Sequence, residues 1–501
     1  MVLRAGRLGT TLVLCALAGG PARAQGASAT EPSQARSEGS AGAPEARVER
    51  VEGVGRLEIR GIRGEIEVRP GPPGELRWAA SPLEGAQAGP EILAAPSPSG
   101  LRIGPAGEEV RAGCRLEVAV PPGLAVDVES DEGRFSATGL RSPVAIRGAS
   151  LEVELKGIVE QVSVTIRGGK ASLSNVVGDV EVYGIDLAVD VVAAEGPVRA
   201  GLEGGGLRSR DTRGGLEATL TGSTLVASGV GGGLVLRARG GAAEVSGLEG
   251  AATIEMEGAS LKLTKSKGEI DVVTDGNVDL RETGGTLRVD ASAGFVHASA
   301  HEGLLEIRGA RDTRISVTTV AGPVRLEGLG LKAMLHELRG GVEARLADSS
   351  LAVDGLQGES LVDVEGGTVA VSASEDRLAL RARGADVRLS GLRGPVDVDA
   401  DGPRVQVAWA AIPQVEDSSV RNASGPVEIG LAGPGGCAIE ARSRSGKVRS
   451  ALPGLGLVDD GREARGRFGS GGAASIRIEA EGDIVLRGAG GRGRPPQGPV
   501  R

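Results

Sequence analysis

Aromatic residues are rare in this sequence, which has two tryptophans, one tyrosine and three phenylalanines among 501 residues. They are scattered along the chain, so the sequence predicts neither a stacking platform for nucleic-acid bases nor an aromatic strip for sugars. A concentrated basic face is also missing, because 57 Lys and Arg residues are outnumbered by 66 Asp and Glu residues. This mild negative balance argues against nucleic acid as a partner.

Cysteine and histidine are equally scarce. Cys114 and Cys437 lie at opposite ends of the repeats described below, whereas a disulfide needs Cα atoms within about 7 Å of each other. We therefore expect two free, partly buried thiols, with a disulfide as the alternative. His297 and His301 would converge on a helix but need not do so on a strand and its corner, and His336 is a single further imidazole. No metal ligand and no cofactor-binding residue is predicted.

Long apolar runs are absent except near the N-terminus. Residues 1–24 have the pattern of a secretory signal peptide, in which Arg4 and Arg7 precede an apolar run and the sequence Ala22-Arg23-Ala24 provides a cleavage site. Leu14 stands before Cys15 where a lipoprotein cleavage site needs a small residue, so no lipid anchor is expected. The run is too short to span a membrane, and no later stretch could form a transmembrane helix. We predict export to the periplasm, the cell surface or the exterior.

The abundant feature is a repeat of 18 residues. Apolar residues recur at intervals of 18 up to Ile270 and at intervals of 16 to 20 afterwards: Val144, Val162, Val180, Val198, Leu216, Leu234, Ala252, Ile270, Leu287, Leu305, Val324, Val342, Val362, Leu378 and Val396. A second small or apolar residue follows each after two positions, another pair lies near nine and eleven, and a further apolar residue lies near fourteen. Alternation with period two indicates β-strands, and the glycine clusters between them indicate sharp corners.

One such repeat cannot fold alone. Its roughly five inward side chains contribute about 1.5–3 kcal/mol each, while fixing its backbone costs on the order of 1–2 kcal/mol per residue. Stacking removes the deficit, because each repeat then shares hydrogen bonds and buried surface with its neighbours. A left-handed hexapeptide helix would place apolar residues every six positions, which does not fit. The pattern favours a flattened two- or three-sided solenoid, and its fifteen regular turns would rise over roughly 70 Å.

We therefore predict an all-β fold, a single long parallel β-solenoid (β-helix) with about 18 residues per turn and irregular β segments capping both ends. The segments before it, 56–61 and 64–70, are expected to form a hairpin. The expected organisation along the chain is a signal peptide (1–24), a disordered linker (25–47), an N-terminal β cap with a first turn (48–125), the solenoid repeats (126–408), closing turns with a C-terminal cap (409–487) and a disordered tail (488–501).

Several phrases carry a family resemblance: Leu116–Gly123 leading to Val126–Gly133, the recurring Gly-x-Val-x-Val pattern, and the closing segments Ser445–Val448 and Glu481–Leu486. In these, and over about residues 50 to 490, the sequence is similar to a bacterial domain-of-unknown-function family of β-strand-repeat proteins that carries the name "putative adhesin". The resemblance implies a role in the cell envelope or at the cell surface. It supplies no catalytic residues.

Carboxylates occupy many outward positions, and paired acids could form a glycosidase or calcium-dependent lyase site. A solvated acidic face is the simpler interpretation of this set: Glu152, Glu154, Asp179, Glu181, Asp186, Asp190, Asp271, Asp275 and Asp279. The short repeat spacing leaves no room for loops that could wall a deep pocket.

The sequence thus predicts an exported, non-catalytic cell-envelope scaffold, adhesin-like or structural, with envelope polysaccharide or a surface protein as its partner and no catalytic residue. The alternatives are a scaffold that self-assembles through its ends and, with less support, a polysaccharide lyase or hydrolase built on a β-helix.

Overall fold

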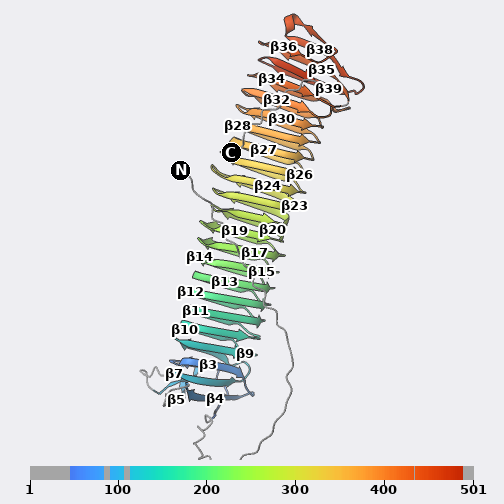
Figure 1. Cartoon of the computed structure of the whole chain (residues 1–501). Helices are drawn as coiled ribbons and strands as arrows, with labels where there is room; N and C mark the ends of the chain where they lie inside the picture. The colour runs from blue at the N-terminus through green and yellow to red at the C-terminus, as the bar shows by residue number, and fades with distance from the viewer. Residues whose placement is uncertain (1–45, 84–90, 107–112, 434, 489–501) are drawn as a thin grey trace, which may run out of the picture. The chain divides into compact units, whose positions relative to one another are not determined.

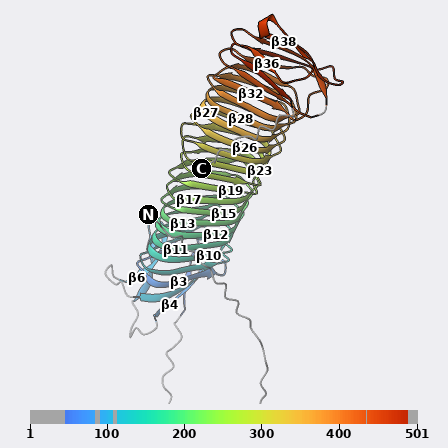
Figure 2. The ribbon, with the colours of Figure 1, turned by 45° about the horizontal axis from the view of Figure 1, so that its top comes forward.

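The computed structural model describes residues 46–83, 91–106, 113–433 and 435–488. The predicted signal peptide, residues 25–45 of the predicted linker and residues 489–501 of the predicted tail lie outside these ranges. The described chain forms a parallel β-solenoid of about 17 turns with about 18 residues per turn (Figures 1 and 2). This confirms the predicted fold class. Within the described residues, no helix has the length and apolar character needed to cross a membrane.

Each regular turn contributes two strand segments, and each segment pairs in parallel with its counterparts in the turns before and after. The first-strand stack contains, in spatial order, β8 (Ala125–Ser130), the first halves of β10 (Val144–Lys156), β11 (Val162–Val176), β12 (Val180–Ala194) and β13 (Val198–Thr212), then β14 (Leu216–Thr221), β16 (Leu234–Arg239), β18 (Ala252–Glu257), β20 (Lys267–Thr274), β22 (Gly284–Ala291), the second half of β23 (Phe295–Gly309), β25 (Val324–Leu329), the first halves of β27 (Val342–Leu356) and β28 (Ser360–Ser374), β29 (Leu378–Arg383), β31 (Val396–Asp401) and β33 (Ser418–Asn422).

The second-strand stack contains β9 (Gly133–Thr138), the second halves of β10 to β13, β15 (Thr224–Val230), β17 (Ala242–Leu248), β19 (Ser260–Thr264), β21 (Val278–Arg281), the first half of β23, β24 (Arg314–Val320), β26 (Lys332–Leu338), the second halves of β27 and β28, β30 (Asp386–Leu392), β32 (Arg404–Trp409) and β34 (Val427–Leu431). We number positions within a turn from its first inward residue, so Val180 is position 0 of its turn and Tyr183 is position 3.

The core is built from the predicted inward positions 0, 2, 9, 11 and 14. In the turn that begins at Leu216 these are all buried: Leu216, Ala218, Leu225, Ala227 and Val230. Position 4 is inward as well, as Leu220 and Val364 show. The sequence pattern missed this column because residues such as Gly148 and Gly184 interrupt it. The buried side chains of all turns form one continuous hydrophobic cluster.

Corners recur at positions 6 and 13, where the backbone adopts the left-handed conformation. Position 6 is often glycine, as in Gly168 (φ 72°) and Gly204 (φ 72°), but Asp186 adopts the same conformation with φ 52°. At position 13 even an alanine, Ala193, adopts the left-handed conformation, with φ 56°. A bend at the same two positions of each turn superimposes successive turns, so equivalent residues become neighbours.

The register corrects one part of the sequence prediction. Val362 was expected to begin a turn, but β27 pairs with β28 so that Ala344 lies opposite Val362, and Ser360 lies opposite Leu378. Ser360 therefore occupies position 0, and its buried hydroxyl accepts a hydrogen bond from the amide of Val342 at 3.0 Å. The interval of 18 residues is kept here, with a satisfied serine in place of an apolar side chain.

The predicted hairpin between residues 56–61 and 64–70 is wrong. β2 (Arg56–Arg60) pairs in parallel with β6 (Gly100–Pro105) and β8, while β3 (Arg63–Pro70) pairs with β7 (Gly113–Val120) and β9. Gly61, with φ 70°, makes a solenoid corner and not a hairpin turn. The first turn of the chain is thus inserted between two turns that come later in the sequence.

Antiparallel strands close this N-terminal end. β5 (Ile92–Ser97) pairs with β6, β4 (Glu75–Pro82) pairs with β7, and β1 (Arg47–Arg50) pairs with the outer side of β4. Arg47 lies over the ring of Trp78 at 4.9 Å from its centroid. The outermost strands are protected from further pairing by the charges of β1 and by Pro96 in β5.

The C-terminal end repeats this arrangement. β39 (Ser475–Ala480) lies between β33 and β35 (Gly436–Ser443), and β40 (Ile484–Gly488) lies between β34 and β36 (Val448–Ser450). The last described turn, formed by β39 and β40, is therefore also inserted between two turns that come earlier in the sequence. Beyond β35, the antiparallel strands β38 (Glu463–Gly469) and β37 (Leu455–Val458) complete the sheet, with η1 (Asp459–Gly461) between them.

Candidate functional site

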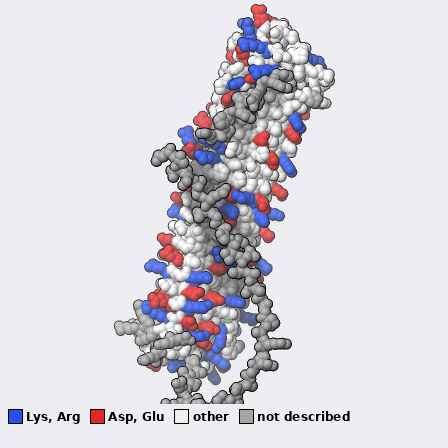
Figure 3. Space-filling view, viewed as in Figure 1, with Lys and Arg blue, Asp and Glu red and all other residues white. Residues whose placement is uncertain are grey.

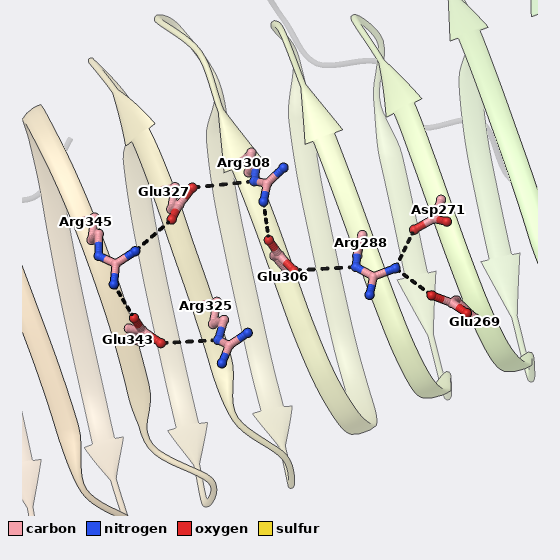
Figure 4. Close-up of polar contacts among 9 residues, drawn as sticks. All are labelled: Glu269, Asp271, Arg288, Glu306, Arg308, Arg325, Glu327, Glu343 and Arg345. Atoms are coloured by element: carbon pink, nitrogen blue, oxygen red, sulfur yellow. Dashed lines mark hydrogen bonds and ion pairs between the residues drawn. The ribbon is translucent and has the colours of Figure 1, made fainter.

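A ladder of opposite charges covers part of the first-strand face. Glu306 contacts Arg308 at 2.7 Å and Arg288 at 3.6 Å, and Arg288 reaches Glu269 at 2.6 Å (Figure 4). Glu327 in the next strand, β25, lies 3.3 Å from Arg345 in β27. The hydrogen bonds that Arg288 donates to Glu269 and then to Asp271 raise the pKa of Arg288 above its ordinary value.

The ladder follows from the order of charges along two outward columns. Position 1 carries residues of alternating sign, namely Asp271, Arg288, Glu306, Arg325 and Glu343. Neighbouring residues in the position 3 column alternate in sign through about half of the solenoid: Asp290, Arg308, Glu327, Arg345, Asp363, Arg381, Asp399, Arg421 and Glu479. Equivalent residues in adjacent parallel strands are about 4.8 Å apart, so like charges would repel. Basic and acidic side chains are accordingly interspersed on the face shown in Figure 3.

The candidate acidic residues do not gather into one site. Glu154 pairs with Arg134 at 2.7 Å, Asp190 with Arg210 at 3.4 Å and Asp279 with Arg281 at 2.8 Å. Glu181 and Asp179 both pair with Arg199, Asp271 pairs with Arg288, and Glu152 lies near Arg134. Asp275 accepts a hydrogen bond from the amide of Gly258, and Asp186 occupies a corner of its turn. Among the described residues, no three His, Cys, Asp or Glu side chains are placed to hold a metal ion.

The histidines are separated by the register. His297 points outward and stacks on Phe295 with ring centroids 6.2 Å apart. His301 points into the core, where its Nδ1 lies 3.0 Å from the hydroxyl of Thr283 and its buried Nε2 has no partner among the described residues. Burial lowers the pKa of His301, and the opposing contributions of Leu304, Thr283 and Glu302 are smaller.

His336 belongs to a short chain of polar contacts on the second-strand face. Its Nδ1 lies 3.1 Å from Asp354, and Ser372 donates to the same carboxylate at 2.6 Å. In a nucleophilic triad the imidazole must contact the hydroxyl, because it removes the hydroxyl proton. Here the carboxylate stands between them, so the imidazole does not contact the hydroxyl of Ser372 as a triad requires.

Cys114 and Cys437 are both free, as expected, but they are fully rather than partly buried. Burial raises the pKa of Cys437 to about 11 and raises the pKa of Cys114 as well. Since the thiolate is the reactive form, both are inert core residues.

Two aromatic side chains stand out because they are exposed. Trp78, Trp409 and Phe135 are buried, whereas Tyr183 is 45% exposed and Phe295 is 40% exposed. Each of the two exposed rings lines a shallow groove, and the grooves lie on different faces. The sequence predicted only scattered aromatics, because most residues that line each groove come from other turns.

The Tyr183 groove lies on the first-strand face and has a volume of about 790 Å³. It is lined by residues from positions 3, 4 and 5 of neighbouring turns, among them Arg147, Thr165, Arg167, Ile185, Glu203 and Thr219. Gly201 lies directly beside Tyr183, and a Cβ atom there would come within 2.8 Å of the ring atom Cδ1. The glycine therefore makes room for the ring.

The Phe295 groove lies on the second-strand face and has a volume of about 550 Å³. Phe295 and His297 form one side, and Val226, Lys262 and Asn277 are among the other lining residues. Lys262 is paired with Glu244 at 2.6 Å, so its charge is already compensated. Writing the turns beneath one another in register would have revealed both grooves.

Comparisons with known proteins add little to these observations. No protein-family model matches the chain, and no curated protein matches it either. Among solved structures, a Clostridium sporogenes ATCC 15579 protein described as a "putative cell adhesion protein" is similar, with 8% sequence identity and a TM-score of 0.12, over 89% of this chain and 100% of that one. A likeness this weak carries no argument, so membership of the adhesin-named family stays a prediction.

Proposed function

We propose that this protein is an exported, non-catalytic scaffold of the cell envelope that acts as an adhesin-like binding surface for polysaccharide or for a surface protein. The observation that carries this proposal is the form of its grooves. They are shallow depressions formed by outward side chains of successive turns, and no described loop extends over them to enclose a substrate. Enzyme sites usually bury most of a small ligand, which such surfaces cannot do.

The polar groups support the same proposal. The carboxylates that could have served as acid and base are paired with arginines or hold backbone amides, and Ser372 is bonded to a carboxylate. A repeating face instead suits a repeating ligand, because many weak contacts add up when a polymer binds along it.

The test mixes the full chain with isolated cell-wall sacculi and with a panel of envelope polysaccharides, and it measures both pelleted protein and newly formed sugar ends. Pelleting without new ends is the expected result. New sugar ends would overturn the proposal in favour of a lyase or hydrolase. Absence of both would exclude polysaccharide and leave a surface protein or self-assembly.

One observation favours self-assembly as a second candidate. The outer strand β37 carries Leu457 and Val458, which are 57% and 54% exposed, and its outer edge has no partner among the described strands. An uncharged exposed edge invites pairing with another strand. Because the outer N-terminal strands carry charges in β1 and a proline in β5, two copies would join through their C-terminal ends and form a dimer, not a filament.

Sedimentation velocity over a hundredfold range of concentration tests this candidate. A monomer–dimer equilibrium that Leu457→Lys abolishes would support it. The matched control is Val48→Lys in the charged strand β1, which should leave the equilibrium unchanged. A monomer at all concentrations would exclude it.

A further inference from the structure

The Tyr183 groove differs in its chemistry from the charge ladder on the same face. Position 3 of neighbouring turns carries Thr165, Tyr183 and Gly201 in succession, in place of alternating charges. We propose that this groove is a subsite for an extended glycan that carries carboxylate groups. The inference rests on the proposed function, and it adds the place of binding and the class of ligand.

The ring is positioned in advance of binding. Its edge lies against Gly201, where an added Cβ would be 2.8 Å from Cδ1 and 3.1 Å from Cε1 of Tyr183. Ile185, at position 5 of the same strand, is 38% exposed and extends the apolar surface. Packing against the glycine restricts the ring, so little side-chain entropy remains to be lost when a ligand binds.

An apolar surface of this size beside hydroxyl groups suits a sugar. The face of an aromatic ring carries partial negative charge, and it attracts the partially positive C–H groups on the face of a sugar ring. Thr165, Thr219 and Thr221 line the same groove. Their hydroxyls both donate and accept hydrogen bonds, as sugar hydroxyls require.

The charges of the groove select an acidic glycan. Arg167 has Ala149 and Ile185 as its neighbours in the position 5 column, so no acidic residue compensates it from either side. No ion pair within 4.0 Å is found for Arg167 among the described residues. Guanidinium groups bind carboxylates through two parallel hydrogen bonds.

A second cation lies along the groove. Arg147 is only loosely engaged, at 3.8 Å from Asp127. Glu203 is the one acidic residue of the lining, and it lies two turns from Arg167 with Ile185 between them. Two arginines against one glutamate favour an anionic polymer over a cationic one.

A peptide fits this surface less well. The backbone amides and carbonyls of β11, β12 and β13 are already paired with the turns before and after. An extended peptide gains much of its affinity by adding a strand to a free edge, and no free edge exists on the face of a sheet. The groove crosses five turns from Arg147 to Thr219, which corresponds to roughly 19 Å at 4.8 Å per turn. This length suits a polymer rather than a single sugar.

The test measures binding of the full chain to polygalacturonate and to the same polymer after reduction of its carboxyl groups. Tyr183→Ala should weaken binding to polygalacturonate by about tenfold or more, which corresponds to the loss of one stacked aromatic contact. Arg167→Gln should remove the preference for the acidic polymer. Gly201→Ala, which displaces the ring without removing it, should fall between the wild type and Tyr183→Ala.

Phe295→Ala is the matched control, because it removes the other exposed aromatic side chain from the opposite face and should leave binding unchanged. Circular dichroism and thermal unfolding of each variant verify the fold, which the replacement of an exposed tyrosine should not affect. If the wild type binds envelope polysaccharides but Tyr183→Ala binds equally well, the groove assignment is wrong and the proposed function stands. If the wild type prefers the reduced polymer, the assignment of an acidic ligand is wrong.

Discussion

Two stretches of the same face share a backbone and differ in their outward side chains. In the turns from Val162 to Thr221, positions 3 and 5 present Tyr183, Ile185 and uncompensated charges, whereas in the turns from Asp271 to Asp363 positions 1 and 3 form a charge ladder. Apart from the buried His301, the inward columns and corners follow the same pattern in both. The comparison teaches that the repeat fixes only the inward and corner residues, so the outward positions of a solenoid can hold either a stabilising ladder or a binding surface.

The corners should prove common to both stretches. Gly205 and Gly367 occupy position 7 of their turns with φ 83° and 84°, and an added Cβ would lie 2.3 Å from the carbonyl oxygen of Leu187 or 2.0 Å from that of Ser349. Replacing either glycine by alanine should lower the free energy of unfolding by about 2–4 kcal/mol. Urea denaturation followed by circular dichroism measures this. A large effect in only one stretch would contradict a shared scaffold.

Converting the binding stretch into a ladder should weaken binding strongly with little effect on stability. The triple variant Thr165→Glu, Tyr183→Arg, Gly201→Glu restores alternating charge between Arg147 and Thr219. Binding to polygalacturonate should fall at least tenfold, while stability should change by less than about 1 kcal/mol, the usual scale of exposed ion pairs. Retained binding would show that Tyr183 is not the anchor.

Acid should weaken the ladder stretch through its core. His301 occupies inward position 14, where the binding stretch has Val176 and Ala194. Because burial lowers its pKa, the folded chain keeps it neutral while the unfolded chain takes up a proton. Stability is therefore retained above the unfolded pKa of about 6.5 and falls as the pH drops below it, with a slope of up to about 1.4 kcal/mol per pH unit.

Denaturation midpoints at pH 7.5 and pH 5.0 test this dependence. His301→Leu should reduce the difference between the two midpoints, and His297→Leu, which alters an outward imidazole, serves as the control. An unchanged pH dependence in His301→Leu would count against this interpretation.

The smallest effect is expected within the ladder itself. Glu306→Gln weakens contacts with both Arg288 and Arg308. The loss should stay below about 1 kcal/mol and should shrink in high salt, because exposed charges are screened. Glu203→Gln in the binding stretch should leave stability unchanged. Thermal unfolding at low and high salt compares the two, and equal losses would mean that the ladder contributes nothing of its own.

Much of the scaffold could be predicted from the sequence, because inward residues repeat with a fixed period. The predicted register failed where a hydrogen-bonded polar side chain occupies an inward position, and the predicted pairing failed where strands pair with distant segments. Ser360 fills an apolar position through a hydrogen bond, so the pattern was shifted by two residues to Val362. Residues 56–70 have the alternation and the glycine of a hairpin, but their strands pair with segments that are far away in the sequence.

The Tyr183 groove was not predicted for a related reason. Thr165, Tyr183 and Gly201 are separated by 18 residues at each step and become neighbours only through the stacking register. Nothing local marks them as a set. The ladder could have been found by comparing the signs of charge at equivalent positions of successive turns. Outward residues thus become informative only after the fold has placed them beside one another.

The insertion of the first and last turns has a mechanical consequence. β2 and β3 lie between β6/β7 and β8/β9, and β39 and β40 lie between β33/β34 and β35/β36. Tension applied to the two ends of the described chain, once the short strand β1 has detached, would load strands that are clamped on both sides. Peeling from an outer edge breaks hydrogen bonds one after another, whereas sliding a clamped strand breaks two rows of them together. Force applied along the chain would therefore meet more resistance at both ends than force that peels away an outer strand.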